Sequence, residues 1–191
     1  MTSHPFAVCV FAGSRPGADP RFLDTAAALG RALARRRTTL VYGGSHAGLM
    51  GALADAALAE GGRVVGVMPH LLVDRENAHR GLHELIITTD MHARKARMAG
   101  LADAFLALPG GYGTLEELFE AVTWGQLGLH RKPVGLLDSG GFWDGLRGFL
   151  AHAREAGFIA DSAWSELPCA SDPDRILDLL AQARHRQPTE I

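Results

Sequence analysis

The sequence predicts an α/β fold, a Rossmann-like, doubly wound parallel sheet of six to seven strands with helices on both faces. Short apolar runs of four to six residues, typical of strands buried on both faces, alternate with longer segments whose apolar residues recur at helical spacing. Glycine or proline directly follows three of the runs, which indicates turns at the strand ends. Strands that alternate with helices in this way favour a parallel sheet.

The apolar runs define the expected strands, and the segments between them define the helices. The strands are expected at residues 6–11, 39–42, 63–68, 84–88, 104–108 and 133–137, with a seventh near 165–168. The helices are expected at 20–36, 48–60, 91–101, 115–128, 142–156 and 172–184. Asp90 precedes the helix at 91–101 and can cap it. Residues 70–83 have little periodicity and are expected to form a loop over the functional face.

Size and composition indicate one ordered domain over residues 1–191, with a frayed tail from 187. A chain of 191 residues can bury a sizeable core, and 47% hydrophobic with 21% charged residues is ordinary for a globular protein. The net charge of -2 gives no bulk attraction to nucleic acid or to an anionic membrane. We therefore expect neither as a partner.

The cellular compartment is predicted from what the chain does not contain. The N-terminal residues lack the basic region and apolar core of a signal peptide, and no apolar run is long enough to span a membrane. Cys9 and Cys169 indicate neither a disulfide framework nor a zinc site. These features predict a cytoplasmic protein.

Ligands of doubly wound sheets bind at the carboxyl ends of the strands, near the switch in strand order. Four segments follow strands at this edge: 13–14, 43–45, 68–76 and 109–114. Ser14, Gly43 and Gly44 are therefore candidate substrate-binding residues.

The most informative segment is 109–114, Pro-Gly-Gly-Tyr-Gly-Thr, between a strand and a helix. Its glycines let backbone N–H groups turn inward, and the helix N-terminus adds free donors and a positive dipole end, a combination suited to phosphate. The spacing matches neither the dinucleotide fingerprint nor the Walker loop. An alternative needs no ligand: Thr114 caps the helix and Glu117 reaches back to it in a capping box.

Charged residues on neighbouring segments supply candidates for chemistry. Arg94 and Lys95 begin a helix, where the dipole does not favour cations, so they are either solvated or face an anionic ligand. Arg94 suits phosphate because its planar fork donates two parallel hydrogen bonds. Glu117, in the first turns of the loop helix, is a better catalytic candidate than Glu120. Residues 74–77 are expected to be an exposed polar loop.

Two other kinds of chemistry find little support. The histidines show no metal-ligand spacing and are expected to be structural or exposed; they include His46, His79, His83, His92 and His130. Pyridoxal chemistry needs a lysine for the Schiff base, and the chain has two, Lys95 and Lys132. No metal and no other cofactor is expected.

Two motifs together are specific to a known family. Pro-Gly-Gly-Tyr-Gly-Thr-Leu-Glu-Glu at 109–117, with Met-His-Ala-Arg-Lys at 91–95, closely resembles the LOG family, whose members are cytokinin-nucleotide phosphoribohydrolases often mislabelled as lysine decarboxylases. The resemblance extends over most of the chain, through segments at 8–14, 43–44, 48–51, 124–128 and 132–135. Residues 77–83 depart from the family pattern.

The resemblance implies roles for individual residues. It implies that Arg94 and Glu117 form the catalytic pair. The implied nucleotide contacts are Glu76, Lys95, Gly110, Gly111, Tyr112, Gly113, Thr114, Leu115, Glu116 and Thr123. It also implies a homodimer or a larger assembly.

The implied reaction is hydrolysis of the N-glycosidic bond of an N6-substituted AMP to the free base and ribose 5-phosphate. Three alternatives remain: the same hydrolysis of AMP or other purine monophosphates, a non-catalytic nucleotide carrier on the same fold, and a lysine decarboxylase.

Overall fold

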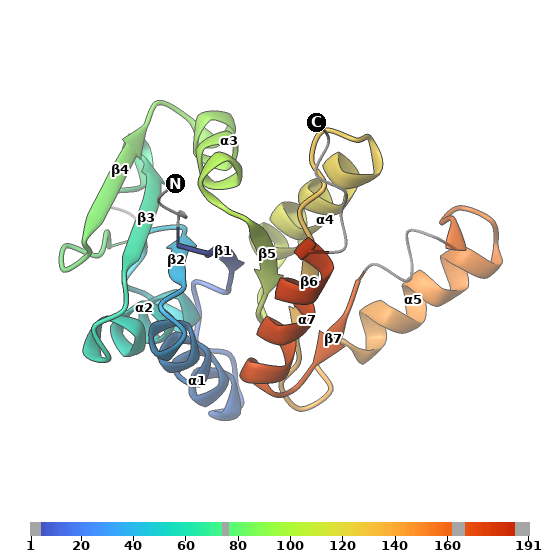
Figure 1. Cartoon of the computed structure of the whole chain (residues 1–191), viewed down its shortest axis with the longest axis horizontal. Helices are drawn as coiled ribbons and strands as arrows, with labels where there is room; N and C mark the ends of the chain where they lie inside the picture. The colour runs from blue at the N-terminus through green and yellow to red at the C-terminus, as the bar shows by residue number, and fades with distance from the viewer. Residues whose placement is uncertain (1–4, 74–76, 162–166, 186–191) are drawn as a thin grey trace.

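The computed structural model describes residues 5–73, 77–161 and 167–185, and it confirms the α/β class. All seven strands pair in parallel, in the order β4-β3-β2-β1-β5-β6-β7 (Figure 1). The strands are β1 (Ala7–Phe11), β2 (Thr39–Tyr42), β3 (Val64–Pro69), β4 (Glu84–Thr88), β5 (Ala104–Ala107), β6 (Val134–Leu137) and β7 (Cys169–Ala170). The chain moves outward from β1 to β4 and then returns to the other side of β1 with β5. The switch in strand order therefore lies between β1 and β5.

Helices cover both faces of the sheet (Figure 1). The helices are α1 (Arg21–Arg35), α2 (Gly48–Ala59), the short η1 (His70–Leu72), α3 (Met91–Leu101), α4 (Tyr112–Gln126), α5 (Asp144–Glu155) and α7 (Pro173–His185). One core cluster joins α1, α2 and α7 to side chains such as Val8 and Val10 of β1. The other joins α3 and α4 to the alternate side chains, including Cys9 and Phe11. Strand β1 is thus buried on both faces, as its apolar run predicts.

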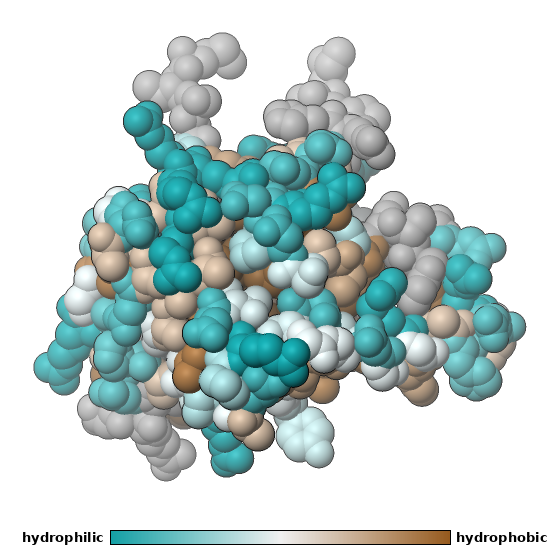
Figure 2. All heavy atoms as spheres, turned by 90° about the horizontal axis from the view of Figure 1, so that it is seen from below, coloured by the Kyte–Doolittle hydropathy of each residue, from teal (hydrophilic) through white to brown (hydrophobic). Residues whose placement is uncertain are grey.

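The outer surface agrees with this layering. Seen from the side of α1 and α2, the molecule presents mainly hydrophilic side chains with scattered apolar ones (Figure 2). No helix among the described residues is long and apolar enough to cross a membrane.

Two predicted boundaries are wrong. The last strand lies at Cys169–Ala170 and not at 165–168, of which 165 and 166 fall outside the described residues. Pro168 has no N–H for the sheet, although its carbonyl accepts from the backbone N–H of Leu136 at 2.8 Å, so the strand begins after it. Helix α4 begins at Tyr112, three residues before the predicted start at 115.

Candidate active site

The glycine loop lies at the switch in strand order. The backbone N–H of Gly13, after β1, donates to the carbonyl of Pro109, after β5, at 3.1 Å. A Cβ added to Gly13 would lie 3.3 Å from the Cα of Gly110, so the two loops touch backbone to backbone. This contact brings the segments after β1 and β5 to one place on the sheet edge.

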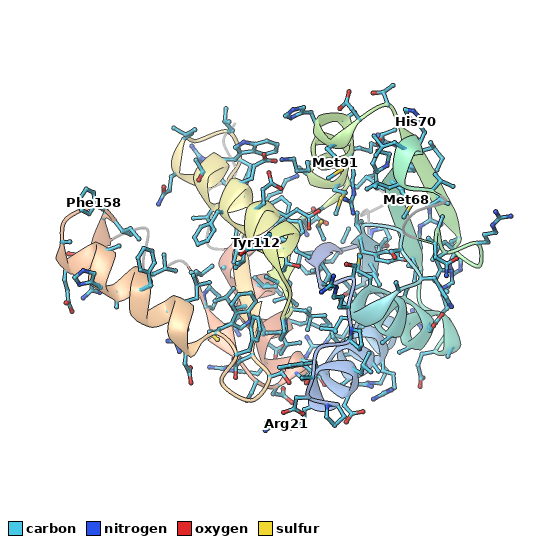
Figure 3. All side chains as sticks on the ribbon, turned by 180° about the vertical axis from the view of Figure 1, so that it is seen from behind. Arg21, Met68, His70, Met91, Tyr112 and Phe158 are labelled. Carbon is cyan, nitrogen blue, oxygen red and sulfur yellow. The ribbon has the colours of Figure 1, made fainter. Side chains whose placement is uncertain are left out.

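The start of α4 provides free backbone donors. Gly111 is the N-cap and no side chain caps the helix; the first bond across the turn runs from the N–H of Leu115 to the carbonyl of Gly111, at 3.0 Å. The N–H groups of the first turn have no acceptor within the helix, and they meet the positive end of its dipole. Tyr112 is 94% exposed and marks this helix start in Figure 3. The geometry is that of an anion site.

The capping-box alternative is wrong. Thr114 is the third residue of α4 and not its cap, and its side chain is buried. Its hydroxyl lies so close to Gly110 that a Cβ on that glycine would overlap it. Thr114 packs under the loop, and Glu117 is not needed to close the helix end.

Arg94, on α3, is buried at the carboxyl edge of the sheet, where two backbone carbonyls accept hydrogen bonds from its side chain. Its Nε donates to the carbonyl of Val67 in β3 at 3.1 Å, and its Nη2 donates to the carbonyl of Gly43 after β2 at 3.3 Å. Asp90 caps α3 as predicted, accepting from the N–H of Ala93 at 2.8 Å, and so fixes the turn that carries Arg94. The start of α3 at Met91 lies beside the end of β3 at Met68 (Figure 3).

Glu117 faces Arg94 from α4. Their closest charged atoms, Arg94 Nη1 and Glu117 Oε1, are 3.8 Å apart, and their side chains are only 7% and 12% exposed. Burying two opposite charges contributes little to stability, because the lost hydration offsets their attraction. Stability alone therefore does not explain this buried ion pair, which lies at the edge of the sheet where doubly wound folds bind ligands.

Lys95 forms ion pairs with two glutamates of α4. Its Nζ contacts a carboxylate oxygen of Glu116 and lies 2.6 Å from Oε2 of Glu120. Burial by itself lowers the pKa of Lys95, but the hydrogen bonds to Glu116 and Glu120 outweigh it, and the pKa is raised overall. Lys95 is thus a charged link between α3 and α4, and a nucleotide that it contacts would share it with these carboxylates.

Of the remaining predicted site residues, some lie at the carboxyl edge of the sheet and others do not. Ser14 is exposed in the loop after β1, and Gly43 and Gly44 follow β2 at the same edge. Thr123 is exposed in a later turn of α4. Glu76 lies outside the described residues.

An apolar groove opens beside Glu117 between α3 and α4. It is a small depression, partly open to solvent, with Lys95, Glu117 and Glu120 among its lining residues. Its apolar lining consists of Phe11, Met98, Ala99, Phe105, Ala121 and Trp124. The sequence did not predict this groove because its walls come from four elements that only the fold brings together.

The structure also assembles a histidine cluster that spacing did not reveal. Ligand-type atoms of His46, Asp55 and His79 lie within 4.8 Å of one another, the one such group among the described residues. Nδ1 of His79 accepts from the N–H of Gly81 at 3.1 Å. A neutral ring then carries its proton on Nε2, the atom that a metal would need, so the observed hydrogen bonds favour a structural role over a metal site.

Comparison with known proteins identifies the family. A family model described as "Possible lysine decarboxylase" matches residues 50–180. The cytokinin riboside 5'-monophosphate phosphoribohydrolase LOG7 of Arabidopsis thaliana is 50% identical over 156 residues, which cover 82% of this chain and 72% of that protein. The phosphoribohydrolase of the same name from Rhodococcoides fascians is 48% identical over 169 residues, covering 88% and 85%. The chain belongs to the LOG family.

Among solved structures, the molybdenum cofactor carrier protein of Chlamydomonas reinhardtii superposes on this LOG protein with a TM-score of 0.73. The two are 21% identical, and the match covers 96% of this chain and 100% of that one. This likeness shows the shared fold alone.

The contacts of both lysines argue against the decarboxylase reading of the family model. Lys95 is engaged by two carboxylates, and Nζ of Lys132 donates to the carbonyl of Ala99 at 2.6 Å. Burial lowers the pKa of Lys132, and nearby Asp103 offsets part of that effect. Schiff-base formation needs a neutral amine with room to attack, and each lysine of this LOG protein already has partners.

Proposed function

We propose that this LOG protein hydrolyses cytokinin riboside 5'-monophosphates to the free base and ribose 5-phosphate. The observation that carries the proposal is the buried pair of Arg94 and Glu117, 3.8 Å apart and beside the glycine loop. Relatives about 50% identical are named for this reaction. The N-terminal turn of α4 binds the phosphate, which leaves the ribose next to the pair.

Bond cleavage leaves positive charge on the ribose ring. A carboxylate beside the anomeric carbon stabilises that charge and orients or deprotonates the attacking water, and this is the role of Glu117. Arg94, fixed by two carbonyls, holds the substrate in the reacting geometry. The phosphate is remote from the breaking bond, so its binding energy can be used to position that bond.

The test is incubation of the purified protein with isopentenyladenosine monophosphate, AMP and the other purine monophosphates, followed by chromatography of the bases. Free isopentenyladenine and ribose 5-phosphate are expected. Release of adenine from AMP at an equal rate would favour the broader purine activity. Tight nucleotide binding with no release of base would favour a carrier.

The apolar groove favours an N6-substituted base over plain adenine. Its lining is mostly aliphatic and aromatic and includes Glu117, the carboxylate proposed to act at the breaking bond. An isopentenyl group that enters it is removed from water, whereas AMP has no group to place there. We therefore propose that the groove receives the N6 substituent.

Ala99→Leu should fill part of the groove and raise KM for isopentenyladenosine monophosphate about tenfold, because the substituent loses part of its apolar contact. KM for AMP should stay unchanged, since AMP does not reach the groove. The ratio of kcat/KM for the two substrates measures the effect. Equal losses for both would show that the groove does not receive the substituent. Gly145→Ala, where a Cβ would meet no atom within 4 Å, is the control.

We also propose that the protein is a homodimer that uses α5. This helix projects from the body (Figure 1), and Leu150 is its one buried residue. Phe149 is 64% exposed, and Phe158, just beyond the helix and labelled in Figure 3, is 88% exposed. Large apolar side chains on a projecting helix are typical of an interaction surface.

The expected mass in light scattering is that of two chains. Phe149→Glu with Phe158→Glu should shift the protein to one chain, because two charges per protomer would enter the contact. A dimer that persists in this variant would place the interface elsewhere.

A further inference from the structure

A short loop is fastened to the segment that follows β2. The N–H of His46 donates to the carbonyl of Asn77, and the N–H of His79 donates to the carbonyl of Gly44, both at 2.9 Å. Ser45 and Ala78 form the antiparallel bridge between these two bonds. Asn77 has a φ of 50°, a left-handed conformation that asparagine tolerates better than most residues. Residues 77–79 therefore run antiparallel to residues 44–46.

The side chain of His79 ties this loop to α2. Its Nδ1 accepts from the N–H of Gly81, and its Nε2 lies 2.9 Å from Oδ1 of Asp55. Because Nδ1 is the acceptor, the neutral ring donates its Nε2 proton to Asp55. The ring of His46 packs edge-on against it, with centroids 4.6 Å apart. The side chain of His79 is 7% exposed, so water competes little for these bonds.

The fastened segment is the one that orients Arg94. Gly43 gives its carbonyl to Nη2 of Arg94, and the next carbonyl, of Gly44, is held by the N–H of His79. Two successive glycines have wide backbone freedom, and Gly44 has a φ of 81°. The direction of the Gly43 carbonyl thus depends on the hydrogen bond from the N–H of His79 to the carbonyl of Gly44.

We propose that His79 and Asp55 are positioning residues for hydrolysis, which fix the Gly43–Gly44 backbone and through it the guanidinium of Arg94. The proposal rests on the proposed function. It assigns a task to residues 77–81, which lie within the segment 77–83 that is expected to depart from the family pattern. Neither residue touches the Arg94–Glu117 pair; each acts through the loop.

The kinetic test uses isopentenyladenosine monophosphate at a temperature where circular dichroism shows every variant folded. His79→Ala should lower kcat about 10- to 100-fold with little change in KM, because a displaced guanidinium impairs the reacting geometry more than phosphate binding. Asp55→Ala should have the same effect, and the double variant should be no worse than either, because both remove one bond. His79→Gln keeps a donor towards Asp55 and should recover most of kcat.

The control is Glu84→Gln, which breaks an exposed ion pair with Arg63. Glu84 is the first residue of β4, at the end of the strand away from the site, so kcat should be unchanged. A purely structural role for His79 predicts another pattern: a lower Tm with unchanged kcat. That pattern, or additive losses in the double variant, would overturn the proposal.

A second measurement does not depend on turnover. Exchange of the Arg94 Nη2 hydrogens with solvent, followed by NMR, should be faster in Asp55→Ala than in the wild-type protein, because Nη2 donates to the Gly43 carbonyl that the loop fixes. Asp55 is exposed, and its loss should not unfold the chain. Equal exchange would disprove the positioning role even if the wild-type protein were active. If exchange is faster in the variant but the wild-type protein releases no base, His79 and Asp55 do position Arg94, and it is the proposed reaction that is wrong.

Discussion

Glu117→Gln is expected to lower kcat for release of isopentenyladenine roughly 100- to 10 000-fold, the range typical for loss of a positioned acid or base. Glutamine has nearly the same shape but no negative charge, so it cannot stabilise the cationic ribose or accept a proton from water. Phosphate binding at the start of α4 does not use this carboxylate, so nucleotide affinity should change little. Single-turnover base release and equilibrium nucleotide binding measure the two effects separately.

The matched control is Glu60→Gln at the exposed end of α2, which should have wild-type kinetics. Stability needs its own measurement, because Arg94 is buried and would lose its charged neighbour. A lower Tm together with unimpaired kcat would show that Glu117 serves the fold and not the reaction.

Gly43→Ala should reduce kcat/KM on the order of 100-fold through Arg94. A Cβ at this position would overlap Nη2 of Arg94 and also lie 3.2 Å from the sulfur of Met50. The guanidinium would have to leave the Gly43 carbonyl and move relative to Glu117. Because Gly43 does not have a positive φ, alanine causes no backbone strain there, and the effect is a steric test of the arginine position.

Gly100→Ala is the control for this substitution. Gly100 lies on the same helix as Arg94, and a Cβ there would meet no atom within 4 Å. Alanine should raise stability by up to about 1 kcal/mol and leave kcat/KM unchanged. Wild-type activity of Gly43→Ala would mean that the position of Arg94 seen here is not the one that catalysis uses.

The fold could be predicted because the first six strands coincide with short apolar runs, a purely local signal, whereas the two-residue β7 has no such run. The rule that the carboxyl ends of parallel strands meet at one edge left Arg94 either solvated or facing an anionic ligand, and only the resemblance to the LOG family implied its pairing with Glu117. The start of α4 was missed because the prediction looked for a capping side chain, whereas glycine can begin a helix with its backbone alone. His46, Asp55 and His79 were missed because they come from three separate segments, and no spacing along the chain records their contact.

The way in which Arg94 is held has a consequence for the behaviour of the site in acid. Its two short hydrogen bonds go to main-chain carbonyls of Val67 and Gly43, which do not titrate, and its contact with Glu117 is longer, at 3.8 Å. Protonation of the carboxylate would therefore remove a charge from the site without releasing the guanidinium from its place. The structure thus separates Glu117, the group proposed to act as acid or base, from the contacts that hold Arg94, so a change in the charge of Glu117 leaves both hydrogen bonds of the guanidinium to the main chain in place.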